Sequence, residues 1–154
     1  MILVTLGTQK QPFTRLLDMV EKISTKEKIV VQAGHTKYKS KKMEIFEFAD
    51  YQTMDKLIDK ANIIITHGGT GSIVTPLKKG KKVIACPRLK KYHEHVDDHQ
   101  EQIVNTFSEV GYILKADENS DLNNLIKEIK AKNLIKFISN TNNFITKLKE
   151  EIEK

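Results

Sequence analysis

The sequence predicts an α/β protein with a doubly wound, parallel, six-stranded sheet of the Rossmann-like kind. Short apolar runs alternate with longer segments whose apolar residues recur at helical spacing, as in successive strand–helix units. Glycine-rich turns follow two of these runs, at the position where parallel sheets bind ligands. A chain of 154 residues is long enough for one such domain and too short for two, so we expect a single domain over residues 1–154.

Six apolar runs are short enough to be strands. They are Ile2–Leu6, Ile29–Gln32, Ile45–Phe48, Ile63–Thr66, Val83–Cys86 and Tyr112–Leu114. In the common strand order 3-2-1-4-5-6 the first and fourth strands are neighbours, and ligands bind above their carboxyl ends.

Five intervening segments have apolar residues at helical spacing. They are Phe13–Lys22, Thr53–Lys60, Gly71–Lys79, Asp98–Val110 and Asp121–Lys130. Gly80 and Gly111 are stop signals, and Pro76 predicts a bent or short third helix. A helical tail over residues 134–154 is expected to pack back on the domain, with a docking face for a protein or membrane as the alternative.

Composition indicates an ordinary globular protein. The charged fraction is 30% and the hydrophobic fraction 39%, which argues against a disordered chain. We expect a cytoplasmic location, because we find no signal peptide, no apolar stretch near the roughly 20 residues that cross a bilayer, and only one cysteine, Cys86. The net charge of +6 comes with no basic–aromatic interleaving of the RNA-binding kind, so we expect no nucleic-acid partner.

Two glycine turns predict an anion site. His67-Gly68-Gly69-Thr70-Gly71-Ser72 joins the fourth strand to a helix, which places backbone N–H groups and a positive helix end at one point. Gly7-Thr8 follows the first strand. The two turns meet in the expected strand order, so the sequence predicts a nucleoside diphosphate site. A G-x-G-x-x-G turn with an acid ending the second strand is absent, as is a P-loop, which argues against NAD and against ATP or GTP hydrolysis.

A histidine-rich segment follows the fifth strand. His93-Glu94-His95-Val96-Asp97-Asp98-His99 is one residue too long for the His-x-His-x-Asp-His motif of metallo-hydrolases, so we expect no bound metal. The alternative is a polar loop in which Asp98 caps the next helix.

Three segments resemble motifs of one known family. They are Gly7-Thr8-Gln9-Lys10-Gln11-Pro12-Phe13, His67-Gly68-Gly69-Thr70-Gly71-Ser72-Ile73 and Glu94-His95-Val96-Asp97-Asp98-His99-Gln100. In this order they resemble the carboxyl-terminal domain of MurG-like GT-B glycosyltransferases, most of all the stand-alone PssE-like proteins of bacterial exopolysaccharide and capsule synthesis. They are also similar to the soluble subunit of the eukaryotic two-part transferase that adds the second GlcNAc to a dolichol-linked sugar.

The resemblance implies a UDP-sugar site in one half of a GT-B fold. Residues 68–72 would hold the pyrophosphate with Gly7, Thr8 and His67 nearby, and Asp98, His99 and Gln100 would face the sugar and phosphates. Arg88 or Lys91 would partner the leaving charge, and Glu94 and His95 are catalytic candidates for positioning the sugar or assisting proton transfer. One departure is Thr75, where the family often has a glutamate that holds the ribose hydroxyls.

The resemblance also implies a partner, because a GT-B active site lies between two such domains. The expected function is that of a donor-binding catalytic subunit that transfers a sugar from a UDP-sugar to a lipid-linked saccharide. A membrane-anchored PssD-like subunit would supply the acceptor half and keep the chain at the inner face of the membrane. The alternatives are a non-catalytic enhancer of a partner transferase and a nucleotide- or RNA-binding module.

Overall fold

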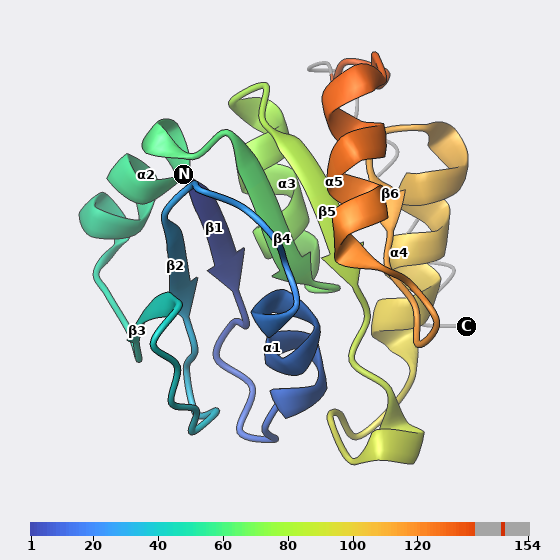
Figure 1. The fold of residues 1–154 in the computed structure, drawn as a ribbon. Helices are drawn as coiled ribbons and strands as arrows, with labels where there is room; N and C mark the ends of the chain where they lie inside the picture. The colour runs from blue at the N-terminus through green and yellow to red at the C-terminus, as the bar shows by residue number, and fades with distance from the viewer. Residues whose placement is uncertain (138–145, 147–154) are drawn as a thin grey trace.

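All six strands lie parallel in one sheet, in the order β3-β2-β1-β4-β5-β6, in the computed structural model, which describes residues 1–137 and 146 (Figure 1). The strands are β1 (Ile2–Thr5), β2 (Ile29–Gln32), β3 (Met43–Phe46), β4 (Ile63–His67), β5 (Lys82–Cys86) and β6 (Leu114–Lys115). The predicted fold class and strand order are therefore confirmed, with β1 between β2 and β4.

Two edge strands differ from their predicted bounds. β3 begins two residues earlier than expected, because the buried Met43 pairs with Ile29 while Phe48 lies beyond the ladder and is half exposed. β6 has only two residues, and the preceding Tyr112 and Ile113 are buried against helices instead of pairing with β5. Apolar content alone places such residues in the core and does not show whether they join the ladder.

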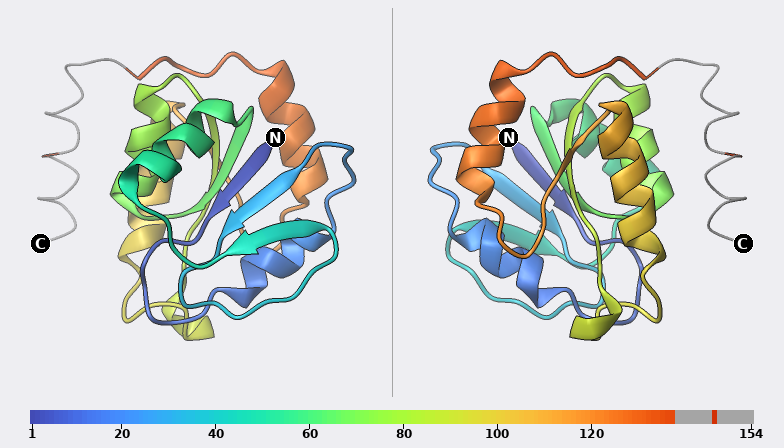
Figure 2. Two further views of the ribbon diagram at one scale, coloured as in Figure 1. Left: turned by 90° about the vertical axis from the view of Figure 1, so that its left-hand side faces the viewer. Right: turned by 90° about the vertical axis from the view of Figure 1, so that its right-hand side faces the viewer.

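Helices cover both faces of the sheet (Figures 1 and 2). One face carries α1 (Thr14–Glu21) and α5 (Leu122–Ala131), and the other carries α2 (Tyr51–Lys60), α3 (Thr70–Lys78) and α4 (His99–Val110). Side chains alternate along each strand between the two cores, so in β4 Ile63 and Ile65 face the first layer and Ile64 the second. The five helices predicted before the tail all form within two residues of their expected ends.

Helix ends follow local side-chain chemistry, with one correction. Gly80 and Gly111, both with positive φ, follow the ends of α3 and α4 as predicted. α3 has 9 residues with Pro76 inside it, so the proline does not make it shorter than the 8-residue α1. The prediction that the Asp98 side chain caps α4 is wrong, although Asp98 occupies the N-cap position. Its carboxylate instead accepts a hydrogen bond from the Lys90 N–H at 2.9 Å. Lys90 begins the 3-residue 3₁₀ helix η1 (Lys90–Tyr92).

The first part of the expected tail helix has no regular secondary structure. Residues 132–137 run along the surface, and Phe137 packs edge-on against Tyr112, with ring centroids 5.1 Å apart. The rest of the predicted tail, residues 138–145 and 147–154, lies outside the described residues. In the described part of the chain, no helix has the length and apolarity needed to cross a bilayer.

Candidate functional site

The two glycine turns meet at the carboxyl edge of the sheet. β1 and β4 are hydrogen-bonded neighbours, and the Thr5 hydroxyl donates to the Thr66 hydroxyl at 2.7 Å just before the turns. Gly7 has φ +75°, and a Cβ built on it would lie 2.4 Å from Nε2 of His67. The chain after β1 therefore passes directly against the residue that ends β4.

His67 fills the space between the two turns. Its side chain lies among buried residues, and a Cβ on Gly69 would approach its Cε1 to 2.7 Å. Both Gly7 and Gly69 thus face the same imidazole ring, from opposite turns. The volume of this ring explains why both positions carry glycine.

The hydrogen bonds of Gln100 determine the tautomer of His67. The Gln100 Oε1 accepts from the backbone N–H groups of Gly68 (2.9 Å) and Arg88 (3.0 Å), so its amide nitrogen is the atom 3.1 Å from Nδ1 of His67. Nδ1 therefore accepts, and the ring proton is on Nε2, which donates to the Ser72 hydroxyl oxygen at 3.0 Å. Ser72 keeps its own hydrogen for another acceptor.

Burial keeps His67 neutral. Its pKa is lowered to about 3, first by desolvation and then by the positive charge of Arg88. An imidazolium would also lose the bond from Gln100, because a protonated Nδ1 cannot accept. The neutral Nε2–H tautomer is therefore the form present at physiological pH.

The first turn of α3 offers open donors beside Ser72. The first backbone bond of this helix runs from the Ile73 N–H to the Gly69 carbonyl at 3.1 Å, so the N–H groups of Thr70, Gly71 and Ser72 precede it without a helical partner. The N-cap is Gly69, and no acidic residue lies in the first turn. These amides, the helix dipole and the Ser72 hydroxyl are arranged as donors of the kind that binds an anion at a helix start. Gly68, which was also expected there, instead donates its N–H to Gln100.

Gln32 stabilises the turn after β1 from the other side. Its Oε1 accepts from the N–H groups of Leu6 (3.2 Å) and Gly7 (3.0 Å), and its amide donates to the carbonyls of Gly7 and Glu47. The sequence places Gln32 at the end of the second strand, where a dinucleotide site would have an acid, and does not indicate these hydrogen bonds. The available signal was a glutamine at the end of an apolar strand, because an amide that becomes buried there must find several partners.

Arg88 is a buried cation that connects two loops next to the glycine turns. It is 1% exposed and donates to the carbonyls of Leu6 (2.7 Å), Gln11 (2.6 Å) and Glu94 (3.0 Å). Burial lowers its pKa to about 10. The guanidinium thus links the loop after β1 to the loop after β5, and in this structure it does not reach solvent.

Glu94 is buried in an ion pair that the sequence did not reveal. Arg15 from α1 donates through Nε to one carboxylate oxygen and through Nη2 to the other, both at 2.9 Å, and the Leu89 N–H donates at 3.0 Å. The Arg15 guanidinium also lies over the Tyr92 ring, 4.9 Å from its centroid. His95 lies next to this pair and contacts Asp97, Nδ1 to Oδ1 at 3.2 Å.

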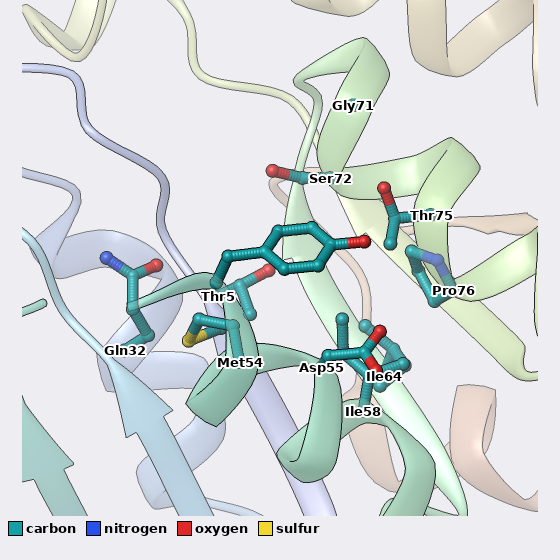
Figure 3. A pocket seen from close by; sticks show the side chains of 11 residues that line it. Thr5, Gln32, Met54, Asp55, Ile58, Ile64, Gly71, Ser72, Thr75 and Pro76 are labelled. Atoms are coloured by element: carbon teal, nitrogen blue, oxygen red, sulfur yellow. The ribbon is translucent and has the colours of Figure 1, made fainter. Parts of the chain in front are cut away.

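The remaining predicted residues lie at separate places around the two turns. Thr8, Asp98 and His99 are exposed, and Lys91 forms an ion pair with Glu118. Thr75 lines a pocket of about 210 Å³ together with Gly71 and Ser72 (Figure 3). No group of three or more His, Cys, Asp or Glu side chains suited to a metal ion occurs among the described residues.

The fold and the geometry together define a Rossmann-like domain with open helix-start amides at its switch point. Comparison with protein families identifies the chain, over residues 1–154, with the glycosyltransferase family 28 C-terminal domain. The chain belongs to this family.

Several known proteins are similar. The UDP-N-acetylglucosamine transferase subunit ALG13 of Candida glabrata is 33% identical over 115 residues, 73% of this chain and 56% of that protein. The ALG13 subunit of Saccharomyces cerevisiae is 34% identical over 73 residues, 47% of this chain and 34% of that protein. The chain therefore matches about half or less of the length of these relatives.

Solved structures share the fold. An NMR structure of ALG13 superimposes with a TM-score of 0.61 at 22% identity, over 99% of this chain and 96% of that one. MurG of Acinetobacter baumannii superimposes with a TM-score of 0.55 at 16% identity, over 82% of this chain and 40% of MurG. At these identities the likeness concerns the fold alone.

Replacement of Gly7 tests the contact between the two turns. We expect Gly7→Ala to lower the free energy of unfolding by about 2–5 kcal/mol, because the new Cβ would combine a positive φ with a clash against His67. Gly71→Ala is the matched control: no atom lies within 4 Å of its Cβ position, and helical alanine is favoured over glycine by up to about 1 kcal/mol. Chemical denaturation measures both, and equal stabilities for the two variants would contradict the proposed contact.

The burial of neutral His67 predicts a pH-dependent stability. The unfolded histidine binds a proton near pH 6.5 and the folded one near pH 3, so stability is lost as pH falls between these values. One such proton contributes a slope of about 1.4 kcal/mol per pH unit. Denaturation curves at several pH values give the free energy of unfolding as a function of pH. Between pH 6.5 and pH 3 this free energy should change less steeply with pH for His67→Gln than for the wild-type chain. An unchanged slope would show that His67 titrates normally in the fold.

Proposed function

We propose that the chain is the donor-binding, catalytic subunit of a two-component glycosyltransferase that uses a UDP-sugar. The observation that carries this proposal is the anion site at the start of α3, where three open amides and an oriented Ser72 hydroxyl lie beside the turn after β1. Family membership and the similarity to subunits named UDP-N-acetylglucosamine transferase support it. UDP-N-acetylglucosamine is therefore the first donor to test.

In this proposal the pyrophosphate binds at residues 70–72. Negative charge develops on the leaving UDP as the bond to the sugar breaks, and donors already aimed at it stabilise the transition state. The Gln100–His67–Ser72 chain of hydrogen bonds holds the hydroxyl donor in place before the substrate arrives. We propose that this set of donors acts without a metal ion.

Residues of the loop after β5 contribute in different ways. Glu94 is held by Arg15 and the Leu89 amide, so we propose that it positions the loop rather than taking a proton. His95 is partly exposed and is oriented by Asp97, so it remains our candidate for assisting proton transfer or positioning the sugar.

We further propose that the acceptor half is a separate, membrane-anchored subunit that binds a lipid-linked saccharide. The relatives are themselves named as subunits of a transferase, which supports a partner. A basic chain with a net charge of +6 is suited to a cytoplasmic membrane face bearing anionic lipid. The resemblance to PssE-like proteins suggests an exopolysaccharide or capsule acceptor, and the similarity to ALG13 suggests a lipid-linked glycan for proteins; both acceptors belong to the same chemical class.

Replacement of Ser72 tests the donor site. We expect Ser72→Ala to weaken UDP binding to the purified chain about tenfold, because a hydrogen bond to a charged group is lost. Thr106→Ala is the matched control, since that hydroxyl bonds to the carbonyl of Gln102 within α4, away from the turns. Titration calorimetry or NMR measures both affinities, and equal UDP affinity of the two variants would contradict the proposed site.

Sugar transfer separates the catalytic role from the enhancer alternative. The purified chain is mixed with membranes of the cells that produce it, and transfer from labelled UDP-N-acetylglucosamine to lipid is measured. We expect no transfer by the chain alone, transfer by the mixture, and a loss with Ser72→Ala that parallels its loss of UDP affinity. Full transfer by a variant that no longer binds UDP would instead show an enhancer.

A further inference from the structure

A pocket between α2 and α3 continues directly from the anion site. Its volume is about 210 Å³, and its lining includes Gly71 and Ser72, which also belong to the first turn of α3. A group attached to a phosphate at residues 70–72 would therefore have this pocket beside it. Complete sites for drug-sized ligands have volumes of roughly 300–1,000 Å³, so this pocket holds one part of a larger ligand.

The walls of the pocket are apolar with a few polar atoms at fixed places. Met54 and Ile58 of α2, Pro76 of α3 and Ile64 of β4 form much of the lining. Tyr51, the first residue of α2, also lines the pocket although its side chain is 79% exposed. A flat apolar group can thus enter between aliphatic walls and stack on an aromatic ring at the surface.

Each of the two helices contributes one oxygen-bearing side chain to the pocket. The Asp55 carboxylate comes from α2 and the Thr75 hydroxyl from α3, and both line the pocket (Figure 3). The Lys79 Nζ lies 2.9 Å from Oδ1 of Asp55 and 2.7 Å from Oδ1 of Asp59, and it forms an ion pair with both carboxylates. This lysine holds the Asp55 carboxylate at the pocket wall and balances its charge, so that an anion can bind nearby.

We propose that Asp55 is the residue that selects a ribonucleoside, by accepting hydrogen bonds from the ribose hydroxyls while the base stacks on Tyr51. This inference rests on the proposed function, because it assumes that a nucleoside diphosphate binds with its phosphates at α3. A vicinal diol offers two donors, and a carboxylate offers two acceptor oxygens where Thr75 has one. The acidic partner of the ribose thus comes from α2, across the pocket from Thr75.

Paired ligands and paired variants test the role of Asp55. UDP is compared with 2′,3′-dideoxyuridine diphosphate, which lacks both ribose hydroxyls, on the purified chain by titration calorimetry. We expect Asp55→Asn to weaken UDP binding about tenfold to a hundredfold, the range for a hydrogen bond to a charged group, and to leave the dideoxy ligand within about twofold.

Asp59→Asn is the matched control for this comparison. This substitution removes the same charge one turn further along α2, from the other carboxylate that contacts Lys79. Asp59 itself does not line the pocket. We expect it to change neither affinity by more than about twofold. Thermal unfolding of both variants verifies that each remains folded.

A third variant tests the position of the base. We expect Tyr51→Ala to weaken UDP and its dideoxy analogue by the same factor, about fivefold or more, because loss of stacking is independent of the sugar hydroxyls. An unchanged affinity for both ligands would show that the base lies elsewhere and would overturn this part of the inference.

The outcomes separate this inference from the proposed function. If UDP binds and Asp55→Asn behaves like Asp59→Asn, Asp55 does not hold the ribose, and the donor site at α3 stands. If Asp55→Asn weakens both ligands equally, Asp55 acts through charge or structure, and the inference fails. If the wild-type chain binds neither UDP nor the analogue at millimolar concentration, the proposed function fails together with the inference.

Discussion

A neutral imidazole wedged between two backbone turns determines the geometry of this site. His67 ends β4, contacts the backbone of Gly7 after β1 and leaves room only for glycine at position 69. Its two nitrogens are both used, one by Gln100 and one by Ser72. Because a buried polar ring without partners would be strongly destabilising, each of these contacts constrains the others.

Amide side chains extend this constraint to the surrounding loops. Gln100 joins the turns after β4 and β5 through two backbone N–H groups, and Gln32 joins the turns after β1 and β3. Arg88 then connects the loops after β1 and β5 from behind. Buried amides and one guanidinium thus organise the carboxyl edge of the sheet, and the open amides of α3 are what this framework presents to a ligand.

The central part of the fold could be predicted because each of its strands is a short apolar run. Ile63–Thr66 lies within β4 and Ile29–Gln32 matches β2, since strands buried on both faces carry apolar side chains almost throughout. The edge of the sheet was predicted less well, because Tyr112 and Ile113 are as apolar as strand residues but pack against helices.

The roles of single charged residues depend on partners that are distant in the sequence. Glu94 and Arg88 follow a strand end and are charged, as substrate-binding residues often are. Their actual partners are distant in the sequence: Arg15 lies 79 residues from Glu94, and Gln11 lies 77 residues from Arg88. No local pattern indicates these contacts. The glycine turns are different: a strand, a glycine turn and a helix start are adjacent in the sequence, so the place where the two turns meet could be located from the sequence.

The protonation state of His67 tests the account most directly. Long-range nitrogen–proton NMR spectra of the labelled chain distinguish protonated from unprotonated ring nitrogens. We predict that the spectra show one histidine with a proton on Nε2 and none on Nδ1, and that its signals do not change from neutral pH down to about pH 4. These signals should be absent from the spectra of His67→Gln. A His67 ring that carries its proton on Nδ1, or that titrates near pH 6.5, would contradict the account.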